Sequence, residues 1–148
     1  EQSVFLEELH SISYGQPPEI NFPNEKNNGV SILELINKKL LNSVHDVSAG
    51  GLIITLAEMV IGSEFGVKIK KPENLTNLTK YFFGEDQGRY VIEIDKNNLL
   101  NVEKILKKNG VFYENIGFTQ KDYLEIKDEI KINIKDLKVI NDKWYNNY

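Results

Sequence analysis

The central segment of the chain reads Ser43-Val44-His45-Asp46-Val47-Ser48-Ala49-Gly50-Gly51. Its first five residues include β-branched side chains, which are typical of strands, and the glycine pair that follows predicts the end of the strand. Apolar residues then recur on one helical face as far as Gly62, at Leu52, Leu56, Met59 and Val60. The segment therefore predicts a strand, a glycine turn and a helix.

Working outward, the neighbouring segments alternate in the same way. Before the central segment, Ser31 and Glu34 form a capping box, and apolar residues at helical spacing predict a helix over 31–41. After it, period-two alternation predicts strands at 67–70, 90–94 and 111–119, and a hairpin of 123–126 with 130–134. Helices are expected near 75–82, from an Asp95 cap to Asn109, and over 137–144.

This order of elements predicts the α+β class, with a mixed, largely antiparallel sheet layered with helices. The chain has 148 residues, of which 41% are apolar, enough for one compact domain over 1–148. Residues 1–30 are expected to be an irregular arm, because Gly15-Gln16-Pro17-Pro18 interrupts any periodicity and 24–29 are polar. Residues 31–148 would then form the folded module.

Composition excludes several classes of function. The net charge of -4 argues against a nucleic-acid partner, and no apolar run approaches the roughly 20 residues of a membrane-spanning helix. We therefore expect a cytoplasmic chain that contacts neither nucleic acid nor membrane. The absence of cysteine removes disulfides, thiolate metal sites and cysteine nucleophiles, and His10 and His45 lie in no HExxH motif.

The glycine turn is the first candidate site. A strand that ends in Gly50-Gly51 and opens a helix presents backbone N–H groups and the positive end of a helix dipole, which favour an anion such as phosphate. Asp46 could hold a metal or a polar ligand group. In the alternative interpretation Asp46 or Ser48 only caps the helix, His45 is a supporting or core residue, and the glycines make a tight turn. The residues themselves leave both interpretations open.

The second candidate is the loop Gly84-Glu85-Asp86-Gln87-Gly88-Arg89. Its two acids, amide and guanidinium could clamp a polar ligand. A solvated turn whose acids pair with Arg89 is the simpler interpretation of the same residues.

Taken together, the two stretches resemble a known family. The run from His45 through Gly51 to Met59, followed by Phe83-Gly84-Glu85-Asp86-Gln87-Gly88-Arg89-Tyr90, is similar to the C-terminal module of the aminoimidazole ribonucleotide synthetase-like superfamily. Within it, the sequence resembles the last such module of the phosphoribosylformylglycinamidine synthase family, over essentially all 148 residues. That module is partly ferredoxin-like, and the chain would be a fragment of a longer protein.

The resemblance implies a function and a set of sites. Such synthases use ATP and magnesium to convert formylglycinamide ribonucleotide and ammonia to the amidine. The implied partners are the N modules of the same synthase, a glutaminase subunit or domain that supplies ammonia, and a small bridging subunit. The resemblance carries ligand-binding roles to the two stretches and to the start of the chain: Ser3, Asp46, Ser48, Gly50, Gly51, Glu85, Asp86 and Gln87, with His45 and Arg89 supporting them. It implies no catalytic residue in this chain, which alone is expected to be inactive, and it leaves the metal ligands unknown.

One departure and two alternatives qualify the transfer. Family members begin this region with Gly-Gln-Ser or Gly-Gly-Ser, whereas Glu1 precedes Gln2-Ser3 here, which weakens the role of Ser3. A non-catalytic docking module would need only the structural role of the glycine turn. Thiamine-phosphate kinase and selenophosphate synthetase share the superfamily, but the Glu85-to-Arg89 loop favours the synthase.

Overall fold

The computed structural model of the chain describes residues 3–72 and 76–146, and it divides into two compact units. Unit 1 comprises residues 1–55 and 79–114, and unit 2 comprises residues 56–78 and 115–148. Among the described residues, no helix has the length and apolar character needed to cross a membrane. The single domain expected over 1–148 stays a prediction, which coincident unfolding of the two units would confirm.

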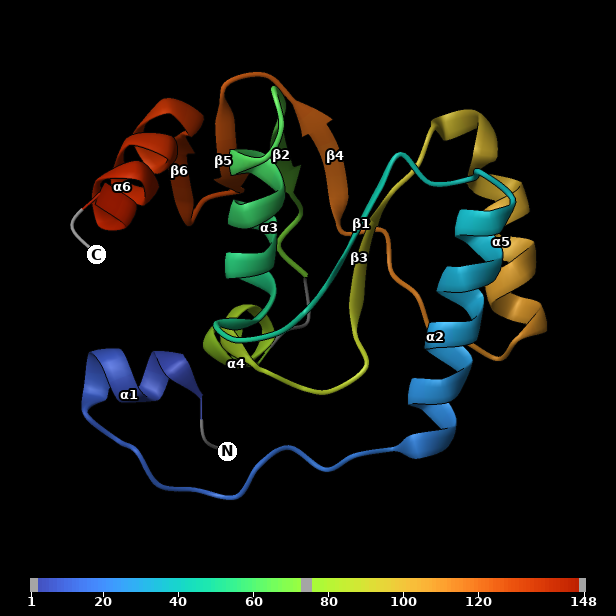
Figure 1. Cartoon of the computed structure of the whole chain (residues 1–148), viewed down its shortest axis with the longest axis horizontal. Helices are drawn as coiled ribbons and strands as arrows, with labels where there is room; N and C mark the ends of the chain where they lie inside the picture. The colour runs from blue at the N-terminus through green and yellow to red at the C-terminus, as the bar shows by residue number, and fades with distance from the viewer. Residues whose placement is uncertain (1–2, 73–75, 147–148) are drawn as a thin grey trace. The chain divides into compact units, whose positions relative to one another are not determined.

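Unit 1 contains a helix pair and a two-stranded sheet (Figure 1). Helix α2 (Phe22–Asn37) packs beside α5 (Leu99–Lys108), which continues from the 3-10 turn η1 (Lys96–Asn98). Strands β1 (Ser43–Asp46) and β3 (Tyr90–Glu93) pair antiparallel. The unit also holds α1 (Val4–His10), nearly all of α4 (Leu78–Phe83) and the first turn of α3 (Gly51–Ile61).

The core of unit 1 lies between α2 and α5. Leu35 is fully buried there against Val102, Ile105 and Leu106, whose spacing places them on one face of α5. Ile92 and Ile94 pack against the same cluster from β3 and the residue after it. Burial of this apolar face stabilises the helix pair.

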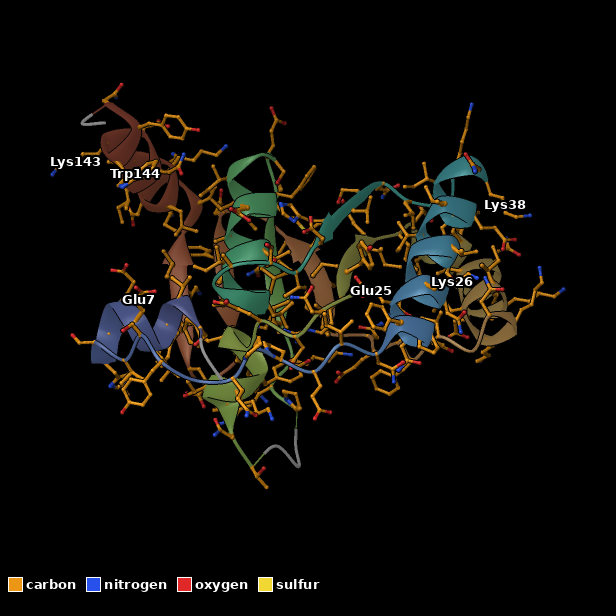
Figure 2. The ribbon with its side chains drawn as sticks, turned by 60° about the horizontal axis from the view of Figure 1, so that its bottom comes forward. Glu7, Glu25, Lys26, Lys38, Lys143 and Trp144 are labelled. Carbon is orange, nitrogen blue, oxygen red and sulfur yellow. The ribbon has the colours of Figure 1, made fainter. Side chains whose placement is uncertain are left out.

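Unit 2 contains a four-stranded sheet in the order β4-β2-β5-β6. Its strands are β2 (Gly66–Ile69), β4 (Gly117–Gln120), β5 (Tyr123–Ile126) and β6 (Ile130–Asn133). Only the central β2–β5 pair is parallel among these; the two outer pairs are antiparallel. Helix α6 (Ile134–Asn146), which carries the Trp144 and Lys143 labelled in Figure 2, follows β6 directly. The predicted α+β class and the mixed, largely antiparallel pairing are confirmed.

The prediction of an irregular arm over residues 1–30 is wrong at both of its ends. Ser3 caps α1, because its Oγ accepts a hydrogen bond from Leu6 N–H. Asn21 caps α2 in the same way through Asn24 N–H, with Pro23 in the first turn. Both helices lack a long apolar repeat at these positions, so their caps were the only local signal. Residues 11–21 between them contain no helix or strand.

Three further element predictions need correction. Ser31 is not a cap but a buried residue within α2, and its hydroxyl donates to the Asn27 carbonyl oxygen at 2.7 Å. The strand predicted over 111–119 is confined to β4, because Val111 and Tyr113 pack against the core of unit 1 instead of pairing in a sheet. The helix predicted near 75–82 begins at Leu78, and Leu75 lies outside the described residues.

The glycine at the start of β2 generates the first prediction. A Cβ on Gly66 would stand 2.6 Å from the carbonyl carbon and 2.8 Å from the amide nitrogen of Tyr123, which lies on the neighbouring strand. Because backbone cannot move aside cheaply, Gly66→Ala should lower the free energy of unfolding by about 3 kcal/mol, or the melting temperature by roughly 8 °C. Gly62→Ala is the matched control, since its nearest neighbour would be 3.4 Å away. Equal melting temperatures for the two variants would contradict the close packing of β2 on β5.

Candidate functional site

The glycine turn between β1 and α3 has the shape that the sequence predicts. Gly50 and Gly51 both have positive φ, +80° and +71°, and Gly51 N–H donates to the Ser48 carbonyl oxygen at 3.0 Å. Both glycines are buried. The turn lets the chain reverse direction between Asp46, at the end of β1, and the first residue of α3.

The missing side chain of Gly51 makes room for protein backbone. A Cβ on Gly51 would lie 2.7 Å from the carbonyl carbon of Phe83 and 2.8 Å from the carbonyl oxygen of Gly84. The end of α4 therefore packs directly on the turn. This close approach explains the glycine without any ligand.

The Glu85 carboxylate occupies the anion position that the turn creates. Its Oε1 accepts hydrogen bonds from Gly50 N–H at 2.9 Å and from Val4 N–H at 2.8 Å. These amides lie at the beginnings of α3 and α1, where the helix dipoles favour negative charge. Any ligand phosphate that bound Gly50 N–H would have to displace this carboxylate. The predicted phosphate roles of Gly50 and Gly51 stay predictions with that added requirement.

A hollow of about 520 Å³ opens beside the turn in unit 1. Four segments line it: the start of α1, the arm before α2, the turn after β1, and the loop before β3. The lining residues are Ser3, Val4, Glu7, Pro17, Pro18, Glu25, Asp46, Val47, Ser48, Ala49, Glu85, Gln87, Gly88, Arg89 and Tyr90.

The charge of the hollow is predominantly negative. Four carboxylates line it, from Glu7, Glu25, Asp46 and Glu85, against the single guanidinium of Arg89. Figure 2 labels two of them, Glu7 on α1 and Glu25 on α2. Such a surface suits groups that donate hydrogen bonds, such as hydroxyls and amides, better than it suits a free phosphate.

Arg89 is held within the loop that precedes β3. Its Nη2 donates to the Gly84 carbonyl oxygen and lies 3.6 Å from Asp86 Oδ2. Of the two acids predicted to pair with Arg89, Asp86 does so. The buried Nε–H of Arg89 has no hydrogen-bond partner among the described residues, 3–72 and 76–146.

The structure brings most of the predicted site residues together. Six line the hollow: Ser3, Asp46, Ser48, Glu85, Gln87 and Arg89. Asp86 instead faces Arg89, and His45 Nδ1 lies 2.7 Å from the carbonyl oxygen of Asp46. Gly50 and Gly51 are buried and do not line the hollow. The ligand-binding roles of all ten residues stay predictions.

Apart from Ser3, the sequence did not predict the part of the lining that comes from the first 25 residues. Glu7 and Glu25 each stand in the first turn of a helix, where acids are common, so neither was conspicuous. Pro17 and Pro18 interrupt the periodicity of the sequence and belong to a stretch, residues 15–19, that fits the family resemblance, but neither signal predicts them in the lining. These four residues line the hollow only because of long-range contacts, which no local sequence pattern indicates.

The residues present do not form a magnesium site of their own. Within the part of the chain that the structure describes, no group of three or more His, Asp or Glu side chains could hold a metal ion. The negative hollow and the engaged glycine amides likewise do not fit the triphosphate of ATP.

Tyr81 on α4 has a raised pKa. Burial, together with the nearby Glu114 carboxylate, which accepts a hydrogen bond from the Tyr81 hydroxyl at 3.1 Å, raises the pKa of Tyr81 to about 12. Tyr81 therefore stays protonated near neutral pH and acts as a hydrogen-bond donor.

Comparison with known proteins gives a consistent result. The family model of the AIR synthase related protein, C-terminal domain, matches residues 6–128. The phosphoribosylformylglycinamidine synthase subunit PurL of Pelagibacter ubique is 47% identical over 148 residues, which is 100% of this chain and 20% of that protein. The PurL of Bartonella bacilliformis is 35% identical over 144 residues, 97% of this chain and 19% of that protein. The chain thus spans about a fifth of the length of the curated relatives it matches.

Solved structures share the fold at low sequence identity. A crystal structure of phosphoribosylformylglycinamidine synthase II from Thermotoga maritima has a TM-score of 0.70 at 14% identity, over 82% of this chain and 22% of that one. T. maritima PurL complexed with FGAR has a TM-score of 0.66 at 16% identity, over 77% and 21% of the two chains. PurLQS from the same organism has a TM-score of 0.68 at 15% identity, over 93% and 24%. T. maritima PurL complexed with ATP has a TM-score of 0.65 at 14% identity, over 76% and 21%.

The crowding at Gly51 generates the second prediction. Gly51→Ala should destabilise the chain strongly, because the new Cβ combines a positive φ with backbone atoms at 2.7 and 2.8 Å. Gly110→Ala is the matched control: its φ is +66°, but nothing lies within 4 Å of the added atom. In denaturant unfolding, we expect Gly110→Ala to lower the free energy of unfolding by about 1 kcal/mol. Gly51→Ala should lower it by at least about 2 kcal/mol more than the control does. Equal losses of unfolding free energy in the two variants would contradict the close packing of the end of α4 on the glycine turn.

Proposed function

Because the chain belongs to the AIR synthase related protein family through its C-terminal domain, we propose that it is the last such module of a phosphoribosylformylglycinamidine synthase. The observation that carries the proposal is the 47% identity with P. ubique PurL along all 148 residues. Relatives with the same name and similar coverage support the synthase over the kinase and selenophosphate branches of the superfamily.

The longer protein would convert formylglycinamide ribonucleotide and ammonia to the amidine, in an ATP-dependent reaction that also uses magnesium. The FGAR and ATP complexes of T. maritima PurL support these ligands for the family. When bound, ATP would supply the phosphoryl group that activates the amide oxygen, and magnesium would neutralise phosphate charge. We propose that this chemistry takes place in the cytoplasm. We also propose that other domains carry it, because the described residues include no group of three or more His, Asp or Glu side chains that could hold a metal ion.

The role of this chain would be to provide one wall of the ribonucleotide site. Carboxylates accept hydrogen bonds from sugar hydroxyls and amide N–H groups, both of which the ribonucleotide offers. Asp46 is well placed for this task, since it lines the hollow and its side chain is 66% exposed. Ser3, Ser48 and Gln87 would add neutral partners, and Arg89 the one positive charge.

A docking role is the second candidate, and the outer face of α2 favours it. Four large apolar side chains lie exposed on this face: Phe22, Val30, Leu33 and Ile36, with exposed fractions of 73%, 51%, 62% and 45%. A surface of this kind marks an interaction site. We propose that another domain of the same synthase covers it. A glutaminase subunit that supplies ammonia and a small bridging subunit complete the proposed assembly, in line with the PurLQS complex of T. maritima.

The wall hypothesis predicts a specific kinetic change. In the longer synthase, Asp46→Asn should raise the KM for the ribonucleotide about tenfold, because the amide cannot replace a charged acceptor for hydroxyl donors. The melting temperature should change little, since the side chain is mostly exposed. Glu64→Gln, an exposed acid in unit 2, controls for the loss of one negative charge. An unchanged KM in Asp46→Asn would leave only the docking role.

The docking hypothesis predicts an effect on assembly. In the longer synthase, Leu33→Asp should lower the melting temperature by roughly 5 °C, because a carboxylate would be buried between domains. Leu100→Asp is the matched control, since Leu100 is 78% exposed on α5, away from the α2 face. If both variants melt like the unmodified synthase, the α2 face is not an interface.

A further inference from the structure

Helix α1 contributes to the hollow but has little packing of its own. It has seven residues, none of which is buried, and Leu9 is 68% exposed. The arm of residues 11–21, which has no helix or strand, connects it to α2 (Figure 1). A helix this short is not stable in isolation, so contacts with the rest of unit 1 must hold it.

Two contacts fasten α1, one to the end of α4 and one to the loop that follows α4. Val4 N–H donates to Glu85 Oε1 at 2.8 Å. The ring of Phe5 packs on the ring of Phe83, with centroids 4.3 Å apart and planes at 37°. Together they fix the first turn of α1, the part of the helix that faces the hollow.

The position of α1 decides which groups line one side of the hollow. Ser3, Val4 and Glu7 all reach the hollow from its first turn and cap. Their places therefore depend on the same two contacts. Release of α1 would remove a hydroxyl and a carboxylate from the lining and widen the opening.

The Glu85 carboxylate links this helix to the glycine turn. The same Oε1 accepts from Gly50 N–H at 2.9 Å, so one atom sets the distance between the start of α1 and the start of α3. Phe5 and Phe83 have no such link, since their contact joins only α1 and the end of α4. The two contacts can therefore be tested separately.

We propose that α1 is a strap that closes one side of the hollow, and that Glu85 is the positioning residue that fastens it. This assigns Glu85 a role through α1 and the glycine turn, in place of direct contact with a ligand. The strap itself is a property of the chain, and its effect on ligand binding rests on the proposed function.

Hydrogen exchange of the 148-residue chain tests the strap directly. Glu85→Ala and Phe5→Ala should each raise the exchange rates of the α1 amides, residues 6–11, at least tenfold, because each removes one fastening. Only Glu85→Ala should also raise the exchange rate at Gly50. Glu85→Gln, whose side-chain oxygen can still accept, should restore most of the protection of α1.

Asp86→Asn is the matched control, since Asp86 is the next carboxylate in the loop and faces Arg89. Unchanged exchange of α1 in both Phe5→Ala and Glu85→Ala would overturn the proposal, and so would an equal increase in Asp86→Asn. Phe5→Ala keeps the test decisive if Glu85→Ala does not fold, because Phe5 lies outside the glycine turn.

Kinetics of the longer synthase separate the strap from the proposed function. Phe5→Ala should raise the KM for the ribonucleotide at least fivefold while kcat changes less than twofold, because the strap shapes binding and carries no reacting group. Faster exchange of α1 with an unchanged KM would confirm the strap and contradict its place in the ribonucleotide site. A fall in kcat alone in Phe5→Ala would contradict a role of the strap in ribonucleotide binding.

Discussion

Two backbone amides share one carboxylate oxygen, Glu85 Oε1, and the arrangement of the hollow depends on this interaction. Gly50 N–H and Val4 N–H lie 35 and 81 residues from Glu85 in sequence, yet both donate to it. Each amide opens a helix, where N–H groups have no partner within the helix. A negative charge there satisfies the donors and interacts favourably with both dipoles. The hollow forms around this point because α1, the glycine turn and the 84–89 loop all meet at it.

The carboxylate can reach Gly50 only because the glycine turn admits the end of α4. Any side chain at Gly51 would collide with the backbone of Phe83 and Gly84, and the loop that carries Glu85 begins at that point. Unit 2 uses the same device independently, where the absence of a side chain at Gly66 lets β2 approach Tyr123 of β5. In both units a glycine permits close contact between backbones, and the hydrogen bonds that follow define the local geometry.

The sequence predicted the elements that have local signals. The strand before Gly50-Gly51, the helix after it, the Asp95 cap and the hairpin of β5 with β6 all depend on residues within a few positions of one another. Ser31 shows the limit of such signals: its spacing from Glu34 fits a cap, but Asn21 and Pro23 start the helix earlier and Ser31 becomes buried. Glu85 shows a second limit. The sequence predicts Glu85 as a ligand contact, which stays a prediction, but nothing local indicates that two distant amides donate to its Oε1.

The negative charge of the hollow indicates which part of the substrate this chain would contact in the proposed synthase. Four carboxylates and one guanidinium cannot by themselves hold a phosphate, and the described residues include no cluster that could hold a metal. An acidic wall would nevertheless have a role beside the proposed ribonucleotide site. In the proposed synthase, such a wall would repel free phosphate and nucleotide, and it would favour a ribonucleotide orientation in which hydroxyl and amide donors face the carboxylates. The Glu85 carboxylate would act in the same direction, because it accepts the hydrogen bond of Gly50 N–H. The chain would thereby contribute orientation to the reaction, while the domains that bind ATP and magnesium contribute its chemistry.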